Sequence, residues 1–212
     1  MATAIAAVSA PAARTADRRI PGILLFLLAG QFMTAIMLAA SMAPAYDLNS
    51  TAISDLGVIP ETALLFNASL VAVGLLNIAG GVAFHREHRR GWITGLYVLA
   101  GLGALGAGLV PLNTSELHGL FALIAFLCFN LQAIASGTLV SGPMRAVSVT
   151  FGLAGLAFVV LMVVGDAGNP AVFGAIGHGG AERMIVYPPM LWMLAFGGHL
   201  MATRAEESPG GH

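Results

Sequence analysis

Long apolar stretches alternate with short polar ones along almost the whole chain. Six of the apolar stretches are long enough to cross the hydrocarbon core of a bilayer, which takes roughly 20 residues of α-helix. They cover residues 20–42, 60–84, 92–110, 117–140, 146–165 and 183–202. The apolar residues are continuous and do not alternate with a period of two, which argues against a β-barrel. We therefore predict an all-α fold, a polytopic bundle of six transmembrane helices joined by short connections.

The composition agrees with lipid as the main solvent of this chain. Hydrophobic residues make up 58% of the sequence and charged residues 9%, with a mean hydropathy of +0.87. Soluble domains are about 45–50% apolar and about 25% charged. No run of basic residues is dense enough to bind nucleic acid. The single cysteine, Cys128, lies in an apolar stretch and excludes a disulfide within the chain.

The arginines set the predicted orientation, because the chain has no lysine. One side of the spans carries eight of the nine: Arg14, Arg18, Arg19, Arg86, Arg89, Arg90, Arg145 and Arg204. The positive-inside rule assigns that side to the cytoplasm, so both termini are predicted to be cytoplasmic in a multi-pass protein of the cell membrane. We expect a disordered N-terminal tail at 1–19, one membrane domain at 20–203 and a C-terminal tail at 204–212.

A polar segment stands out at the predicted extracytoplasmic boundary. Residues 46–61, YDLNSTAISDLGVIPE, lie between the first two spans, and further polar groups begin the fourth and sixth spans on the same side. Helix ends on one side of an antiparallel bundle converge, so a shared pocket is predicted there. The candidate ligand-binding residues are Asp47, Ser54, Asp55, Glu61, His118, Glu182, Arg183 and Tyr187.

Two of these carboxylates also have simpler explanations. Glu61 follows Pro60 at the predicted start of the second span, where a negative charge favours the helix dipole. Asp55 precedes Gly57, so that it could cap a short interfacial helix that ends at the glycine. Capping and ligand binding remain open for both.

Arg183 is the only arginine on the predicted outer side. A cation at a bilayer boundary is expensive unless it is paired. Its candidate partners are Asp47, Asp55, Glu61 or a lipid phosphate, which a guanidinium binds in bidentate fashion. The alternative is that it extends to the lipid headgroups.

A metal site is a weaker hypothesis. Asp55 and His118, with one of His178, Glu182 or Asp47, offer suitable ligand types. They are dispersed along the sequence, so their spacing does not indicate a particular metal, and no motif indicates a cofactor.

Small residues and prolines predict how the helices pack. Gly91 and Gly95, the series Ala100, Ala104 and Gly108, and the pair Gly152 and Gly155 allow close helix contacts, which we assign to packing within the bundle. The adjacent prolines at 188 and 189 are predicted to kink the last span and to leave backbone carbonyls free near the polar cluster.

Several of these motifs also carry a family resemblance. NSTAISDLG at 49–57, the following Phe66-Asn67, LHGLFA at 117–122, and Glu182-Arg183 with Tyr187-Pro188 and Trp192 resemble the bacterial and archaeal six-helix membrane family of unknown function numbered nine-nine-eight. The pattern from Ile53 to Phe66 is also similar to the eukaryotic DRAM-like family. The first resemblance implies architecture without a reaction, and the second implies lipid metabolism or membrane organisation.

Three functions follow from the polar cluster. The first is binding of a lipid headgroup or small ligand at the outer boundary, with membrane lipid as partner and a role as an accessory subunit or homo-oligomer. The second is a lipid-modifying enzyme, a hydrolase or acyltransferase, that uses Asp55 and His118, with or without a metal. The third is a small-solute transporter, which requires a polar path through the other half of the bundle.

Overall fold

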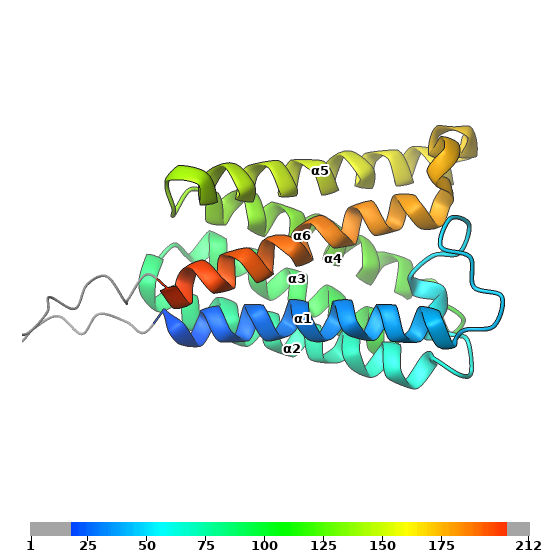
Figure 1. Cartoon of the computed structure of the whole chain (residues 1–212), viewed down its shortest axis with the longest axis horizontal. Helices are drawn as coiled ribbons and strands as arrows, with labels where there is room; N and C mark the ends of the chain where they lie inside the picture. Colours follow the sequence, from blue (N-terminus) through cyan, green and yellow to red (C-terminus); the bar gives the residue numbers. More distant parts are fainter. Residues whose placement is uncertain (1–17, 203–212) are drawn as a thin grey trace, which may run out of the picture.

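The computed structural model describes residues 18–202 and contains no strand in that part of the chain. It has six α-helices and two 3₁₀-helices (Figure 1): α1 Arg19–Met42, η1 Ser54–Gly57, α2 Ala63–His88, α3 Gly91–Leu109, α4 Leu117–Gly137, α5 Gly142–Asp166, η2 Pro170–Ile176 and α6 Gly177–Ala202. Six of the described helices are long and apolar enough to cross a membrane, which confirms the all-α, six-span prediction. The predicted tails at 1–19 and 204–212 lie outside the described residues, apart from Arg18 and Arg19.

The six helices form a closed ring. Each α-helix contacts the next one along the chain, and α6 returns to contact α1. The start of α1 and the end of α6 lie together at one end of the bundle, here called the terminal end, while η1 and η2 lie at the other, here called the loop end (Figure 1). This topology brings the connections after α1, α3 and α5 together at the loop end, as the span pattern predicts.

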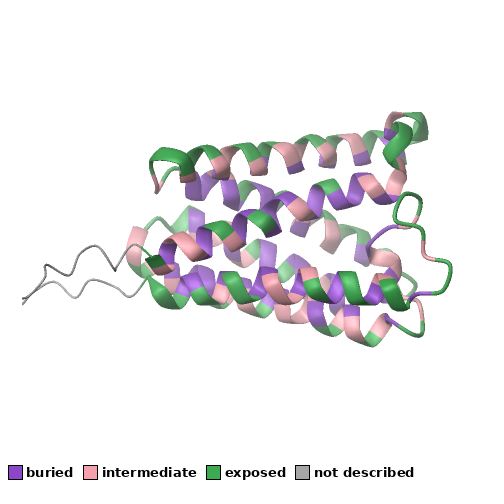
Figure 2. Cartoon of the chain, in the orientation of Figure 1, coloured by how far each residue is buried: buried purple, intermediate pink, exposed green. Residues whose placement is uncertain are grey.

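The outer faces of the ring are apolar and exposed (Figure 2). Leu64, Leu109 and Met37 have exposed fractions of 84%, 69% and 67%. Inside the ring, by contrast, Asn77 and Gln132 are fully buried and their side-chain amides exchange two hydrogen bonds of 3.0 and 3.1 Å. An apolar exterior around satisfied polar groups is what a lipid solvent requires.

Close packing of α2 on α3 depends on glycine. A Cβ on Gly74 would lie 2.5 Å from the carbonyl oxygen of Gly101 and 2.5 Å from Cγ of Leu105. In return, a Cβ on Gly101 would lie 2.7 Å from the carbonyl oxygen of Gly74. The two backbones are therefore too close for any side chain at this crossing.

The small residues of α3 divide into two groups. Ala100, Ala104 and Gly108 are buried, as predicted for packing within the bundle. The prediction is wrong for Gly91 and Gly95, because a Cβ on either would meet no atom within 4 Å in the described part of the chain. A four-residue spacing places these two glycines on one helix face but does not decide which way that face points.

The second span starts later than predicted. α2 begins at Ala63, and Glu61 lies in the exposed turn before it, so Glu61 is not in the first helical turn. The buried hydroxyl of Thr62 donates to the carbonyl of Leu56 at 2.7 Å, which holds the preceding residues in a turn. Glu61 therefore lies directly before the capping residue Thr62, just outside the first turn in which the helix-dipole explanation places it.

The last span starts earlier than predicted. α6 begins at Gly177, so Glu182 and Arg183 lie in its second turn and are both buried. The prolines do not leave the carbonyl of Ile185 free, because the side-chain amide of Asn130 donates to it at 3.2 Å. That carbonyl is the one that lacks a helical donor when residue 189 is proline, so the neighbouring helix α4 supplies the missing hydrogen bond.

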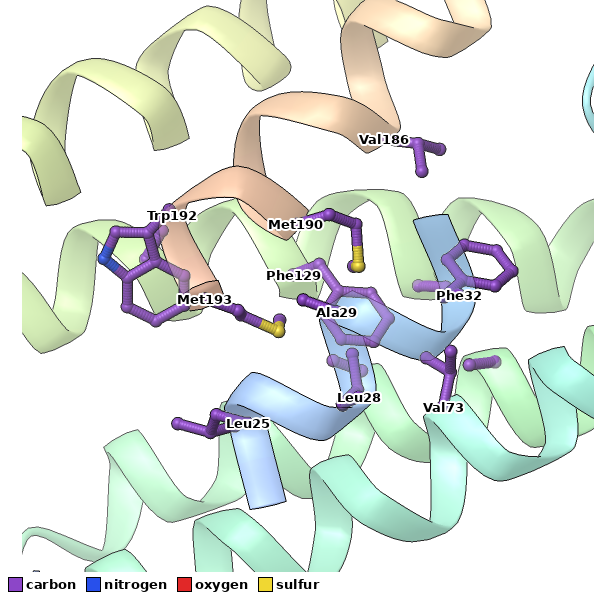
Figure 3. Packing of buried hydrophobic residues seen from close by; sticks show 14 of the residues in the cluster. Leu25, Leu28, Ala29, Phe32, Val73, Phe129, Val186, Met190, Trp192 and Met193 are labelled. Atoms are coloured by element: carbon purple, nitrogen blue, oxygen red, sulfur yellow. The ribbon is translucent and has the colours of Figure 1, made fainter. Parts of the chain in front are cut away.

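Large side chains close the ring interior toward the terminal end. Trp192, Tyr97 and Phe196 are fully buried, and the rings of Trp192 and Phe196 stack with centroids 5.0 Å apart. Phe84 packs edge-on against Phe196 at 5.6 Å. Figure 3 shows Trp192 and Met193 on α6, two and three residues beyond Met190 and more than one turn beyond Val186. This packed layer separates the interior near the loop end from the terminal end of the bundle.

Candidate functional site

The connection between α1 and η1 is bound to α6 by Arg183. Nη1 of the guanidinium donates to the carbonyls of Leu48 at 2.8 Å, Thr51 at 2.9 Å and Gly179 at 2.7 Å. Nη2 donates to the hydroxyl of Tyr46 at 2.7 Å, and Nε has no partner among the described residues. The predicted carboxylate partners are therefore wrong, since this cation is satisfied by backbone carbonyls and a phenol.

Tyr46 completes this contact. The guanidinium carbon of Arg183 lies 5.5 Å from the centre of the Tyr46 ring, within the range of a cation–π interaction. Burial raises the pKa of Tyr46 to about 12, against the opposing effect of Arg183. The hydroxyl therefore keeps its proton at neutral pH and donates it to the carbonyl of Ala52 at 2.7 Å.

The neighbouring residue Glu182 binds the same segment at a second point. Its side-chain carboxyl accepts hydrogen bonds from the backbone N–H groups of Ile53 and Ser54. Consecutive residues of a helix point in directions about 100° apart. Because their side chains point in different directions, Glu182 and Arg183 bind two successive parts of the loop at residues 46–57 from a single turn of α6.

Glycines let the loop approach the start of α6. Gly177 has φ of 65°, and a Cβ there would overlap the carbonyl oxygen of Asn49. A Cβ on Gly179 would overlap the carbonyl oxygen of Thr51. The N–H of Gly179 donates to the carbonyl of Asn49 at 2.8 Å, and the Asn49 amide donates to the carbonyl of Ala175 at 2.6 Å. The 46–57 segment is thus held along its whole length.

Two acidic residues of the segment also fold it locally. Asp47 accepts from the N–H of Asn49 at 3.0 Å and from the hydroxyl of Ser50 at 2.8 Å, and these bonds lower the pKa of its carboxyl. Asp55 accepts from the N–H of Ala52 at 2.9 Å and so caps the turn that leads into η1. The capping explanation of Asp55 is supported, but this bond uses only one of its carboxylate oxygens.

Beneath the segment lies an apolar cavity of about 60 Å³. Its walls come from α1, α2, α3, α4 and α6, and they include Phe32, Phe66, Val73, Phe129, Val186 and Met190. Figure 3 shows Phe32, Val73, Phe129, Val186 and Met190 gathered around this part of the interior. A few polar groups join the apolar wall, namely those of Ser54, His118, Asn130 and Glu182.

A larger and more open groove adjoins this cavity. It measures about 520 Å³ and runs between α4 and α5, below η1 and beside the second turn of α6. The cavity and the groove have five wall residues in common: Ser54, His118, Ala122, Phe126 and Glu182. The groove adds the acidic side chains of Asp55 and Asp166. The groove therefore has polar edges and adjoins an apolar interior, a combination that is usual in small-molecule sites.

His118 stands at the junction and has a fixed orientation. It is only 4% exposed, and its Nδ1 lies 2.8 Å from the carbonyl oxygen of Val110. A carbonyl can only accept, so Nδ1 carries a proton, and in the neutral ring Nε2 is left as an acceptor. His118, at the start of α4, therefore offers Nε2 as a hydrogen-bond acceptor to a ligand.

The predicted site residues are brought together only in part. Ser54, Asp55, His118 and Glu182 line the groove. The other four do not line the groove or the cavity: Asp47, Glu61, Arg183 and Tyr187. Within residues 18–202, no group of three His, Cys, Asp or Glu side chains is close enough to hold a metal ion, so the three-ligand site around Asp55 and His118 is not formed.

Comparison with known proteins gives a family and no activity. Residues 26–199 match the family described as "Protein of unknown function (DUF998)". The chain belongs to this family. No curated protein and no solved structure matches it. The DUF998 match covers all six long helices in whole or in part, so the ring and the loop-end groove both lie within the family region.

The sequence of this DUF998 protein indicates His178 only as a possible metal ligand and does not place Asp166 in the candidate site. Nε2 of His178 lies 3.2 Å from a carboxylate oxygen of Asp166, and both residues line the groove. Their sequence signal was weak, since one ends α5 and the other lies in a glycine-rich stretch. The antiparallel connection from α5 through η2 to α6 is what brings them together.

A separate hollow of about 290 Å³ lies at the terminal end. Arg18, Glu87, His88 and Arg90 are among its walls, and Arg18 forms an ion pair of 2.9 Å with Glu87. It has no wall residue in common with the groove or the apolar cavity. The layer around Trp192 lies between the two ends of the interior.

Proposed function

We propose that this DUF998 protein binds an amphiphilic molecule in the groove at its loop end, with the end of the apolar part in the cavity. The observation that supports this proposal is the contact between the two hollows, which share five wall residues. The volume of the groove, about 520 Å³, is in the range of about 300–1,000 Å³ that is usual for ligand sites.

The position of the groove favours a ligand from the membrane. Leu123 of α4 and Val163 of α5 line the groove and are also exposed on the outside of the ring. The opening between these helices therefore borders the surface that would face lipid. An amphiphile could enter sideways from the bilayer without leaving its apolar surroundings.

The arginine distribution supports an orientation for this site. Among the described residues, six arginines lie at the terminal end and Arg183 lies at the loop end; the six are Arg18, Arg19, Arg86, Arg89, Arg90 and Arg145. By the positive-inside rule, the terminal end is in the cytoplasm and the groove opens at the opposite face of the cell membrane. In this proposal the ligand comes from the outer leaflet.

The other two functions have less support. A hydrolase would pair Ser54 with His118, and no hydrogen bond joins these two side chains in residues 18–202. A transporter needs a path to the terminal end, where Trp192, Tyr97 and Phe196 are fully buried in a packed layer. Binding requires neither feature.

A substitution at the junction tests the proposal. We expect Ala122→Phe to lower the affinity for the amphiphile by about tenfold, or about 1.4 kcal/mol, because a phenyl ring at this shared wall position would take up space in the groove and the cavity. Native mass spectrometry of the protein released from membranes would measure bound lipid-like molecules per chain. Val160→Phe, at a lipid-facing position of α5 that is 63% exposed, is the matched control. Equal retention by both variants would contradict the proposal.

A further inference from the structure

The walls of the groove carry an excess of acidic groups. Asp55, Asp166 and Glu182 contribute three carboxyl groups, and His118 and His178 contribute two imidazoles. None of the arginines that the structure describes lines the groove. If the carboxyl groups are ionised, the lining is negative even when both imidazoles are protonated. Such a lining repels an anion and attracts a cation, most strongly where water is excluded.

Arg183, the arginine at the loop end in residues 18–202, is not available to a ligand. Arg183 is buried, and its two terminal nitrogens already donate to three carbonyls and to the Tyr46 hydroxyl. It faces the 46–57 segment and lines neither the groove nor the cavity. A phosphate or carboxylate in the groove would therefore find no guanidinium to neutralise it.

The hydrogen-bonding atoms of the groove are mainly acceptors. Nε2 of neutral His118 is an acceptor because Nδ1 donates to Val110. One carboxylate oxygen of Asp55 accepts a hydrogen bond from the N–H of Ala52, and the other is left for a ligand. Ser54 adds a hydroxyl and Glu182 a carboxyl. An ammonium group has three N–H donors and no acceptor, so it matches this set, and charged hydrogen bonds are about twice as strong as neutral ones.

From this combination we infer that the polar end of the ligand is a primary ammonium group, so that the protein takes an amine-bearing amphiphile. The inference rests on the proposed function, since it names the chemical class of the molecule bound in the same site. The ammonium lies among Asp55, His118 and Glu182. The apolar chain lies in the groove along Ala122 and Phe126, and only its end enters the cavity of about 60 Å³. The amine could belong to a simple alkylamine or to the headgroup of a lipid.

Chain-matched probes test the charge preference. The full chain in nanodiscs of phosphatidylcholine would be titrated with dodecylamine, dodecanol and dodecyl phosphate, with protein-free nanodiscs as the reference for partitioning. A fluorescent dodecyl probe displaced from the protein would report binding. We expect dodecylamine to bind at least about tenfold more tightly than dodecanol, and dodecyl phosphate to bind least. A further titration with lysophosphatidylethanolamine separates the sources: tighter binding than dodecylamine assigns the amine to a lipid headgroup, and weaker binding assigns it to an alkylamine.

Variants link the preference to the groove. We expect Asp55→Asn and Asp166→Asn each to reduce the preference for dodecylamine several-fold and to leave the affinity for dodecanol unchanged. Glu61→Gln is the matched control, because Glu61 is an exposed carboxylate at the same end of the bundle outside the groove. Since Asp55 also caps a turn, Asp166→Asn keeps the test valid if the first variant unfolds.

The outcomes separate the two proposals. If no dodecyl probe shows saturable binding, the proposed function itself fails. If all three probes bind equally, or if dodecyl phosphate binds best, amphiphile binding stands and the ammonium inference is overturned. A tenfold preference that both aspartate variants retain would also overturn it, because the discrimination would then come from elsewhere.

Discussion

Replacement of Arg183 by methionine is expected to lower the free energy of unfolding by about 3 kcal/mol and to release the 46–57 segment from α6. Methionine keeps much of the apolar stem but removes the hydrogen bonds to Leu48, Thr51 and Tyr46. The freed carbonyls lie near the surface and can take up water, which limits the loss. Hydrogen exchange of the backbone amides at 49–56, together with thermal unfolding in detergent, would measure both effects.

Two further variants sharpen this prediction. Arg183→Lys keeps the charge, yet a single ammonium with three donors cannot reach three carbonyls and a phenol in the geometry of a guanidinium, so only partial recovery is expected. Arg145→Met is the control, because Arg145 is an exposed arginine at the terminal end. Unchanged exchange rates at 49–56 in Arg183→Met would show that the segment is held without this side chain.

The second large effect is expected at the crossing of α2 and α3. Gly74→Ala should destabilise the protein by about 1–3 kcal/mol, because the new Cβ would lie 2.5 Å from the backbone oxygen of Gly101 and the helices must move apart. Gly95→Ala on the same pair of helices meets nothing within 4 Å and should be neutral or slightly stabilising, since alanine favours helix over glycine. Unfolding in mixed micelles of increasing denaturing detergent would rank the two. A reversed order would mean that the crossing differs from the one described.

The six spans could be predicted from the sequence because each one is a continuous stretch of apolar residues. Each of the six predicted spans overlaps one helix over most of its length. The predicted starts differ from the observed ones by three residues in α2, four in α5 and six in α6, because local polarity does not mark the helix boundary. Gly177 and Gly179 are glycines at the start of α6 because a side chain there would overlap the carbonyls of Asn49 and Thr51. These contacts are between residues far apart in the sequence, so the sequence does not reveal them.

The site is predictable only where its side chains carry a chemical signal. Asp55, His118 and Glu182 were identified from polarity at helix ends, and they do line one groove. The role of Arg183 was missed because its partners are mostly backbone carbonyls, which every residue has. The apolar cavity was missed for a similar reason: Phe32, Val73 and Met190 look the same in sequence whether they fill a core or line a hollow.

The central claim is that the loop-end hollow holds an amphiphile, and photolabelling in membranes tests it most directly. A dodecyl probe with a photoreactive group at the end of its chain would be irradiated with the full chain, and the modified residues mapped by mass spectrometry. If the probe binds there, we expect adducts on cavity walls such as Phe129 and Met190. These adducts should be lost in Ala122→Phe and kept in Val160→Phe. Labels confined to lipid-facing residues such as Leu64 and Met37, and unaffected by Ala122→Phe, would contradict it.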